Sequence, residues 1–190
     1  KPKAVAVTHR ALMFQSLAKL SFVPYTSDSL FLHTAALCHV GGLSSAHAML
    51  MARGKHLFLP DFTAQGLLGA VEAFNVTAMI ALPPLVFDMV VFAQQNYKGK
   101  AFSSVKTLLL GGGGTATNLV NAATGLFPNA RITTAYGMTE CASSLTAHLL
   151  WDPSKATPLS DLSPMQRESS DDKWGSCVGY PMPHSQVTIL

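Results

Sequence analysis

Apolar positions along the chain fall into two alternating kinds of segment, separated by turn-forming residues. Short runs of apolar and branched residues predict buried strands at residues 29–33, 55–59, 77–82, 105–110 and 131–135. Longer stretches rich in Ala, Leu and other helix formers predict helices at residues 8–22, 43–52, 63–74, 84–95 and 117–126. Thr8 suits the N-cap of the first helix, and Pro84 suits the first turn of the fourth. Such alternation is typical of α/β proteins, so we expect a parallel sheet with helices on both faces.

The pattern changes near residue 150. Residues 151–173 carry Pro, Ser and Asp without a sustained period, which predicts a long loop. Strand character returns at residues 174–190. We therefore expect an α/β domain over residues 1–150, a loop over 151–173, and the start of a β subdomain over 174–190.

Composition suggests a piece of a larger protein. The chain has 190 residues, of which 48% are hydrophobic and only 12% are charged. That charged share is about half the usual one, which suits a domain whose other faces are covered by protein. The sequence opens without Met and stops inside a strand-like run at residues 187–190. We therefore expect an internal fragment whose partners include the remaining parts of the same polypeptide.

Charge, hydropathy and cysteine content argue against a nucleic-acid-binding, a membrane-spanning and a disulfide-bonded protein. The net charge of +3 comes from scattered Lys and Arg without a basic block, which argues against a nucleic-acid partner. The longest apolar stretch, residues 76–93, contains two prolines and Asp88, so no transmembrane segment is expected. Cys38, Cys141 and Cys177 have no paired spacing, which indicates free thiols in a soluble protein of a reducing compartment.

The most informative residues are 136–140, Tyr-Gly-Met-Thr-Glu, directly after a predicted strand. Ligands of an open parallel sheet bind outside the carboxyl ends of its strands. There Tyr136 can stack on a purine, and Gly137 allows close backbone approach. Thr139 can donate to a phosphate oxygen, and Glu140 can bind Mg²⁺. The motif predicts a nucleotide site. The alternative interpretation is that these residues form an ordinary strand-to-helix turn without a ligand.

Two further segments are expected at the same crevice. Residues 111–114 are four consecutive glycines after a predicted strand, where a flat purine could pack against bare backbone. They match neither the dinucleotide-binding nor the Walker-type pattern. Residues 37–45 also follow a strand and contain His39. Four residues could suggest zinc, but their spacing fits no zinc motif: His33, Cys38, His39 and His47.

These three sites, in this order, resemble the motifs of the adenylate-forming (AMP-binding) superfamily of acyl- and aryl-CoA synthetases, luciferases and peptide-synthetase adenylation domains. The resemblance spans nearly the whole chain. Residues 1–12 are similar to the tail of the family's phosphate loop and the helix after it, although Ala4 replaces the usual Gly. Residues 111–114 resemble its adenine-contacting turn, and residues 136–140 match its adenine, phosphate and magnesium motif throughout. Residues 37–45, 135–146 and 175–179 most resemble the plant-type 2-succinylbenzoate–CoA ligases of phylloquinone and menaquinone synthesis.

The resemblance implies a role for each site residue. Thr139 and Glu140 would be catalytic, and Glu140 would bind the metal. Nucleotide-binding residues would be Lys3, Gly112, Gly113, Gly114, Tyr136, Gly137, Met138 and Thr139. The acyl pocket would contain His39, Gly42, Ser143 and Ser144. We also hypothesise that the two serines contact a second carboxylate of the substrate.

The implied reaction has two steps. A carboxylate attacks the α-phosphate of ATP to form an acyl-adenylate and pyrophosphate, and the thiol of coenzyme A then displaces AMP. ATP, Mg²⁺, CoA and a small carboxylic acid are the expected ligands. The family's remaining catalytic groups would lie outside this chain, so the isolated 190 residues are expected to be inactive. A plastid or a peroxisome is the expected location if the plant-type resemblance holds, and the cytoplasm otherwise.

Other interpretations stay open at this point. The whole protein could instead be a fatty-acyl or an aryl (4-coumarate-like) CoA synthetase. It could also be a catalytically silent nucleotide-binding relative, or an α/β domain with a purely structural role.

Overall fold

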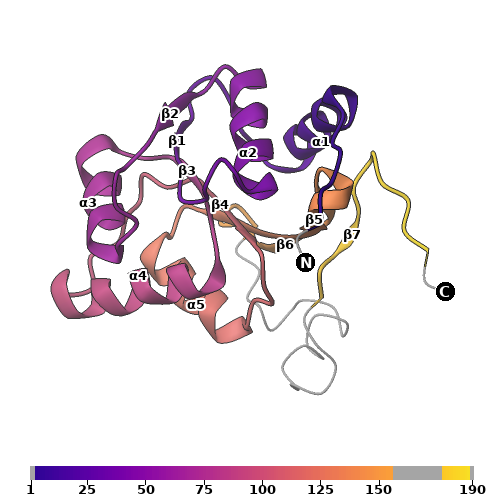
Figure 1. Ribbon diagram of the computed structural model, residues 1–190. Helices are drawn as coiled ribbons and strands as arrows, with labels where there is room; N and C mark the ends of the chain where they lie inside the picture. Colours follow the sequence, from indigo (N-terminus) through magenta and orange to yellow (C-terminus); the bar gives the residue numbers. More distant parts are fainter. Residues whose placement is uncertain (1–2, 156–176, 189–190) are drawn as a thin grey trace.

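The computed structural model describes residues 3–155 and 177–188 (Figure 1). Its α-helices are α1 (His9–Phe22), α2 (Val40–Met51), α3 (Ala64–Phe74), α4 (Pro83–Asn96) and α5 (Thr117–Leu126), and η1 (Thr139–Cys141) is a 3₁₀ turn. Its strands are β1 (Leu30–Leu32), β2 (Lys55–Leu57), β3 (Ala78–Ala81), β4 (Thr107–Gly111), β5 (Arg131–Met138), β6 (Ser143–Trp151) and β7 (Tyr180–Pro181). Every helix and strand predicted within residues 8–135 is present.

The strands form one sheet in the order β2-β1-β3-β4-β5-β6-β7. The first five are parallel to one another, whereas β6 and β7 run antiparallel. Helices α1 and α2 cover one face, and α3, α4 and α5 cover the other (Figure 1). The predicted α/β class, with a mostly parallel sheet flanked by helices, is confirmed.

Side chains of β4 show how the two faces are separated. Leu108 and Leu110 pack in the cluster beneath α3, α4 and α5, whereas Leu109 packs in the cluster beneath α1 and α2. All three are buried, because successive side chains of a strand point to opposite faces and both faces are covered by helices. This is why the strands appear in the sequence as continuous apolar runs.

Helix α2 begins earlier than the sequence predicts. The prediction treated Gly41 and Gly42 as a lead-in to a helix over residues 43–52, but both lie in its first turn. His39 is the N-cap, and its Nδ1 accepts a hydrogen bond from the Gly41 N–H at 3.1 Å. A Cβ on Gly42 would lie 2.3 Å from the carbonyl oxygen of Ala36. Gly42 therefore allows the loop before the helix to pack against its first turn.

The β5–β6 hairpin was not predicted. Strand β5 does not end at residue 135 but continues through Met138, and η1 then turns the chain back into β6. A Cβ on Gly137 would lie 1.8 Å from the carbonyl oxygen of Ser143, so only glycine allows the two strands to approach so closely. The motif of residues 136–140 thus belongs to a hairpin and not to a strand-to-helix turn.

The C-terminal residues described by the structure join the same sheet. Strand β7 pairs with β6 through Ala147↔Tyr180. Most of the predicted loop over residues 151–173, and residues 174–176 after it, lie outside the described residues. Among the described residues, no helix combines the length and apolar character needed to cross a membrane.

Truncating Leu108 tests the two-sided burial of β4. Leu108→Ala should lower the free energy of unfolding by about 2–5 kcal/mol, because it leaves a cavity in a packed core. Leu50→Ala is the matched control, since Leu50 is 63% exposed on α2. Denaturant unfolding of the two variants measures the difference. Equal losses would contradict the assignment of Leu108 to the core.

Candidate active site at the carboxyl ends of the strands

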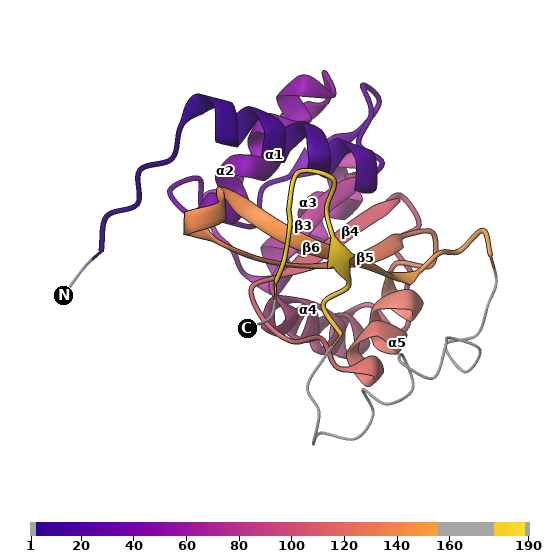
Figure 2. The same ribbon diagram turned by 90° about the vertical axis from the view of Figure 1, so that its right-hand side faces the viewer.

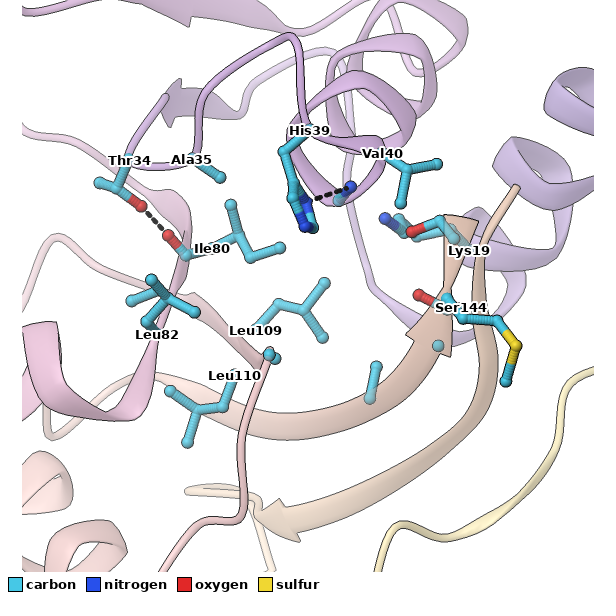
Figure 3. A pocket seen from close by; sticks show the side chains of 18 of the residues that line it. Lys19, Thr34, Ala35, His39, Val40, Ile80, Leu82, Leu109, Leu110 and Ser144 are labelled. Carbon is cyan, nitrogen blue, oxygen red and sulfur yellow. Dashed lines mark hydrogen bonds between the residues drawn. The ribbon is translucent and has the colours of Figure 1, made fainter. Parts of the chain in front are cut away.

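A cavity lies where the carboxyl ends of β3, β4 and β5 meet the start of α2 (Figure 3). Its volume is about 220 Å³. This is the edge of an open parallel sheet at which ligands bind. The lining residues are Lys19, Thr34, Ala35, His39, Val40, Gly41, Ile80, Ala81, Leu82, Leu109, Leu110, Gly111, Gly112, Ala135, Gly137, Met138, Thr139, Ser143 and Ser144.

Two of the predicted segments meet at this cavity through strand pairing. Gly111 at the end of β4 pairs with Ala135 in β5, so the glycine run lies beside the residues that precede Tyr136. Gly112 has a φ of +80°, and a Cβ there would lie 2.5 Å from Cδ2 of Leu82. The backbone at Gly112 therefore needs glycine for both its conformation and its space.

A second cavity of about 370 Å³ adjoins the first and shares Leu82 and Gly112 with it. Its other lining residues are Pro83, Pro84, Phe87, Gly113, Gly114, Ala116 and Leu119. Gly112, Gly113 and Gly114 are exposed, so their backbone is open to a ligand. This location fits the predicted packing of a flat ring against bare backbone.

The motif of residues 136–140 presents its side chains from the hairpin. Tyr136 and Met138 are 46% and 38% exposed, so both are accessible to a ligand. Thr139 lines the first of these cavities from η1. Glu140 lies in the same turn and is exposed, but it is outside the set of cavity-lining residues. The structure brings Gly137, Met138 and Thr139 to the cavity wall and leaves the Glu140 carboxylate accessible to solvent.

The predicted acyl-pocket residues divide into two groups. His39, Ser143 and Ser144 line the cavity, whereas Gly42 is buried within the first turn of α2 and does not line it. The Nδ1 of His39 accepts the Gly41 N–H, so the neutral ring carries its proton on Nε2. That nitrogen is then a donor available to a ligand. Lys3 lies outside both cavities, in an exposed N-terminal segment that extends away from the sheet (Figure 2).

A buried polar network, which the sequence did not predict, forms one wall of the cavity. The amine of Lys19 in α1 donates to the hydroxyls of Ser44 at 2.7 Å and Ser45 at 3.1 Å. Ser44 is in turn hydrogen-bonded to Ser143 at 2.9 Å, so the network joins α1, α2 and β6. Lys19 is only 1% exposed, and burial lowers the pKa of its ammonium group from 10.5 to about 7.

Helix α1 turns polar side chains toward the core and apolar ones toward solvent, which explains why the sequence analysis did not select Lys19 as a site residue. The helix buries Gln15, Ser16 and Lys19, and it exposes the apolar side chains of Phe14 and Leu17. An amphipathic helix normally turns its apolar side to the core. The only sequence signal was the spacing of Gln15, Ser16 and Lys19, which puts three polar residues on one helix face.

The described residues hold no cluster of three or more His, Cys, Asp or Glu that could bind a metal by itself. Residues that could have suggested zinc have other contacts: His33 Nε2 lies 2.8 Å from His56 Nδ1, and His47 bonds the Leu43 carbonyl oxygen. Burial, together with the neighbouring His56, lowers the pKa of His33 to about 4. The single accessible carboxylate of Glu140 instead fits Mg²⁺, which is commonly bound by one or two carboxylates, substrate phosphates and water.

Comparison with known sequences places the chain among enzymes that bind AMP. Residues 1–190 match the AMP-binding enzyme family. The chain is 39% identical over its whole length to the chloroplastic/peroxisomal 2-succinylbenzoate--CoA ligase of Arabidopsis thaliana, of which it covers 33%. It is 26% identical to 4-coumarate--CoA ligase 1 of the same plant, over 78% of this chain and 27% of that protein. The chain thus spans between about a quarter and a third of the length of these relatives.

Solved structures with the same fold include two that carry ligands. One is an E. coli MenE variant with bound OSB-AMS, at a TM-score of 0.71 and 24% identity, covering 100% of this chain and 34% of that one. Another is O-succinylbenzoate Coenzyme A Synthetase (MenE) from Bacillus subtilis in complex with ATP and magnesium ion. Its TM-score is 0.69 at 22% identity, covering 96% of this chain and 33% of that one. With the family match over every residue and the motifs gathered at one sheet edge, the chain belongs to the AMP-binding enzyme family.

Proposed function

We propose that the full-length protein is an ATP-dependent carboxylate–CoA ligase acting on 2-succinylbenzoate. It would first form an acyl-adenylate and then the CoA thioester. The observation that carries this proposal is the meeting of Thr139, Gly111, Gly112 and His39 at one cavity. The substrate is supported by the 39% identity to the Arabidopsis 2-succinylbenzoate--CoA ligase. Because that relative is chloroplastic/peroxisomal, we also propose a plastid or a peroxisome as the location.

The nucleotide would bind along the ends of β4 and β5. The exposed ring of Tyr136 offers a stacking face for adenine, and the open backbone of residues 112–114 offers a flat surface nearby. Gly137 and Met138 complete this wall. Lys3 would need the N-terminal segment to fold back toward the cavity, since the segment extends away from the sheet (Figure 2).

Adenylation depends mainly on positioning and charge neutralisation, because transfer at phosphorus needs little covalent chemistry from the protein. Thr139 is placed on the cavity wall, where its hydroxyl can donate to a phosphate oxygen. Glu140 would hold Mg²⁺, which neutralises phosphate charge when it is bound. CoA would enter as the second substrate and displace AMP.

The acyl group would occupy the part of the cavity between α2 and the sheet. Apolar side chains line it on the sheet side, including Ile80 and Leu109, and His39 lies at the start of α2. Ser143 and Ser144 add hydroxyls from β6. An apolar wall with a few polar groups suits an aromatic acid that carries a second polar substituent.

A second candidate substrate class is supported by the 4-coumarate--CoA ligase relatives at 26% identity. A pyrophosphate-release assay of the full-length protein with ATP and Mg²⁺ separates the two classes. We expect release with 2-succinylbenzoate to exceed that with 4-coumarate and with long-chain fatty acids by tenfold or more. Preference for 4-coumarate or for a fatty acid would replace the proposed substrate, and no release with any acid would favour a silent nucleotide-binding protein.

Removing the Glu140 carboxylate tests its role at the metal. Glu140→Ala in the full-length protein should slow adenylation by roughly 10²-fold or more, the scale of losing one electrostatic stabiliser. Glu72→Ala is a matched control, because Glu72 lies on α3 and pairs with Lys100 at the surface. Single-turnover formation of the acyl-adenylate measures the effect. Similar rates for the two variants would rule out metal binding by Glu140.

Removing the Ser144 hydroxyl tests the acyl pocket. Ser144→Ala should raise the KM for 2-succinylbenzoate by roughly tenfold, because a hydrogen bond to a carboxylate would be lost. The KM for ATP should stay the same, and Ser103→Ala, at an exposed site outside the cavity, serves as the control. Steady-state kinetics with each substrate varied in turn provide the measurement. An unchanged KM for the acid would exclude this contact.

A further inference from the structure

Lys19 places a cationic group at the cavity, and among the described residues no anionic side chain forms an ion pair with it. The distance from the Lys19 amine to every carboxylate of residues 3–155 and 177–188 is therefore greater than 4.0 Å. Its hydrogen-bond partners are the neutral hydroxyls of Ser44 and Ser45. A buried lysine with no opposite charge is rare, because removing an ammonium group from water is costly.

The hydrogen-bond pattern leaves one donor of this amine for a ligand. A protonated lysine has three N–H donors, and the two serines accept two of them. The serines are themselves fixed, because Ser45 donates to the carbonyl oxygen of Gly41 at 2.8 Å and Ser44 bonds Ser143. Lys19 lines the cavity, so the third donor has a ligand-accessible volume beside it. The two serines therefore hold the amine in place, and its third N–H can donate to a ligand in the cavity.

The surroundings favour a negatively charged ligand group. Figure 3 shows Lys19 and Ser144 on the side of the cavity opposite Thr34 and Leu82. The first turn of α2, which includes Val40 and Gly41, also lines it, and a helix N-terminus carries partial positive charge. Burial of the amine lowers its pKa to about 7, and an adjacent carboxylate would favour the charged form again.

We propose that Lys19 binds the carboxylate of the substrate that is not activated, and that it thereby selects dicarboxylic over monocarboxylic acids. This inference rests on the proposed function, since it assumes that the cavity receives the acyl substrate. Lys19 and Thr139 line the same cavity, so one acid can present its reacting carboxylate at Thr139 and its second at Lys19. Ser143 would support the amine through Ser44, whereas Lys19 supplies the charge.

The test compares two acids that differ in one group. These are 2-succinylbenzoate and 4-oxo-4-phenylbutanoate, which lacks the ring carboxylate. The full-length wild-type protein, Lys19→Met and Lys19→Gln are assayed for acyl-adenylate formation with each acid. Lys106→Met is the matched control, because Lys106 is exposed and lies outside both cavities. Replacing an unpaired buried charge by an apolar side chain of similar size is compatible with folding, and Lys19→Gln provides a second variant that stays polar.

We expect the wild-type protein to prefer the dicarboxylic acid by at least about tenfold in kcat/KM, the scale of one hydrogen bond between charged groups. Both Lys19 variants should raise the KM for 2-succinylbenzoate by a similar factor and change kcat/KM for the monocarboxylic acid by less than about twofold. Lys106→Met should behave as the wild type does. Loss of activity toward both acids in parallel, or an unchanged preference in a folded variant, would overturn the proposal.

The wild-type protein also separates this inference from the proposed function. Equal use of the two acids by the wild type would overturn the role of Lys19, whatever the variants do, while leaving the ligase activity intact. Failure of the wild type to activate either acid would contradict the proposed substrate itself.

Discussion

Burial of both faces of the parallel strands is the constraint on which the rest of the structure depends. In β4 the side chains of Leu108 and Leu110 are covered by one helical layer and that of Leu109 by the other. A one-residue change of register would exchange these faces, so the register is strongly specified. With the register fixed, the strands β3, β4 and β5 end at the same edge, and the residues that follow them meet there. The site is a consequence of how the core is packed.

The β5–β6 hairpin adds the part of the site that a simple strand-to-helix unit would not supply. Because Gly137 allows close approach to Ser143, the chain returns immediately and places Ser143 and Ser144 at the same cavity as Thr139. One hairpin thus contributes both the hydroxyl that we propose for phosphate binding and the two that we propose for the acyl pocket. Ser143 also reaches Ser44 in α2, which connects the hairpin with the helices on that face of the sheet.

Sequence patterns predicted most of the fold and part of the site. Strands and helices up to residue 135 were recognised because buried parallel strands and capped helices leave strong local signals, as at Thr8, whose hydroxyl caps α1. The hairpin was missed because its turn depends on a contact between Gly137 and Ser143 that no local pattern records. Gly42 was read as a lead-in because its tertiary role, packing under Ala36, is likewise not local. Lys19 was missed because α1 turns its polar residues inward.

These misses share a physical cause that bears on function. A buried ammonium group bonded only to hydroxyls is unfavourable for folding, and glycines in a strand and in a helix weaken both elements. At Lys19, Gly42 and Gly137 the observed structure differs from the one that the residue type favours. Lys19 and Gly137 line the cavity. Natural sequences are otherwise locally consistent with their folds, so such disagreements concentrate where a site must be formed. At Lys19 the unfavourable burial is relieved if an anionic ligand binds, since a carboxylate then places an opposite charge beside the buried amine.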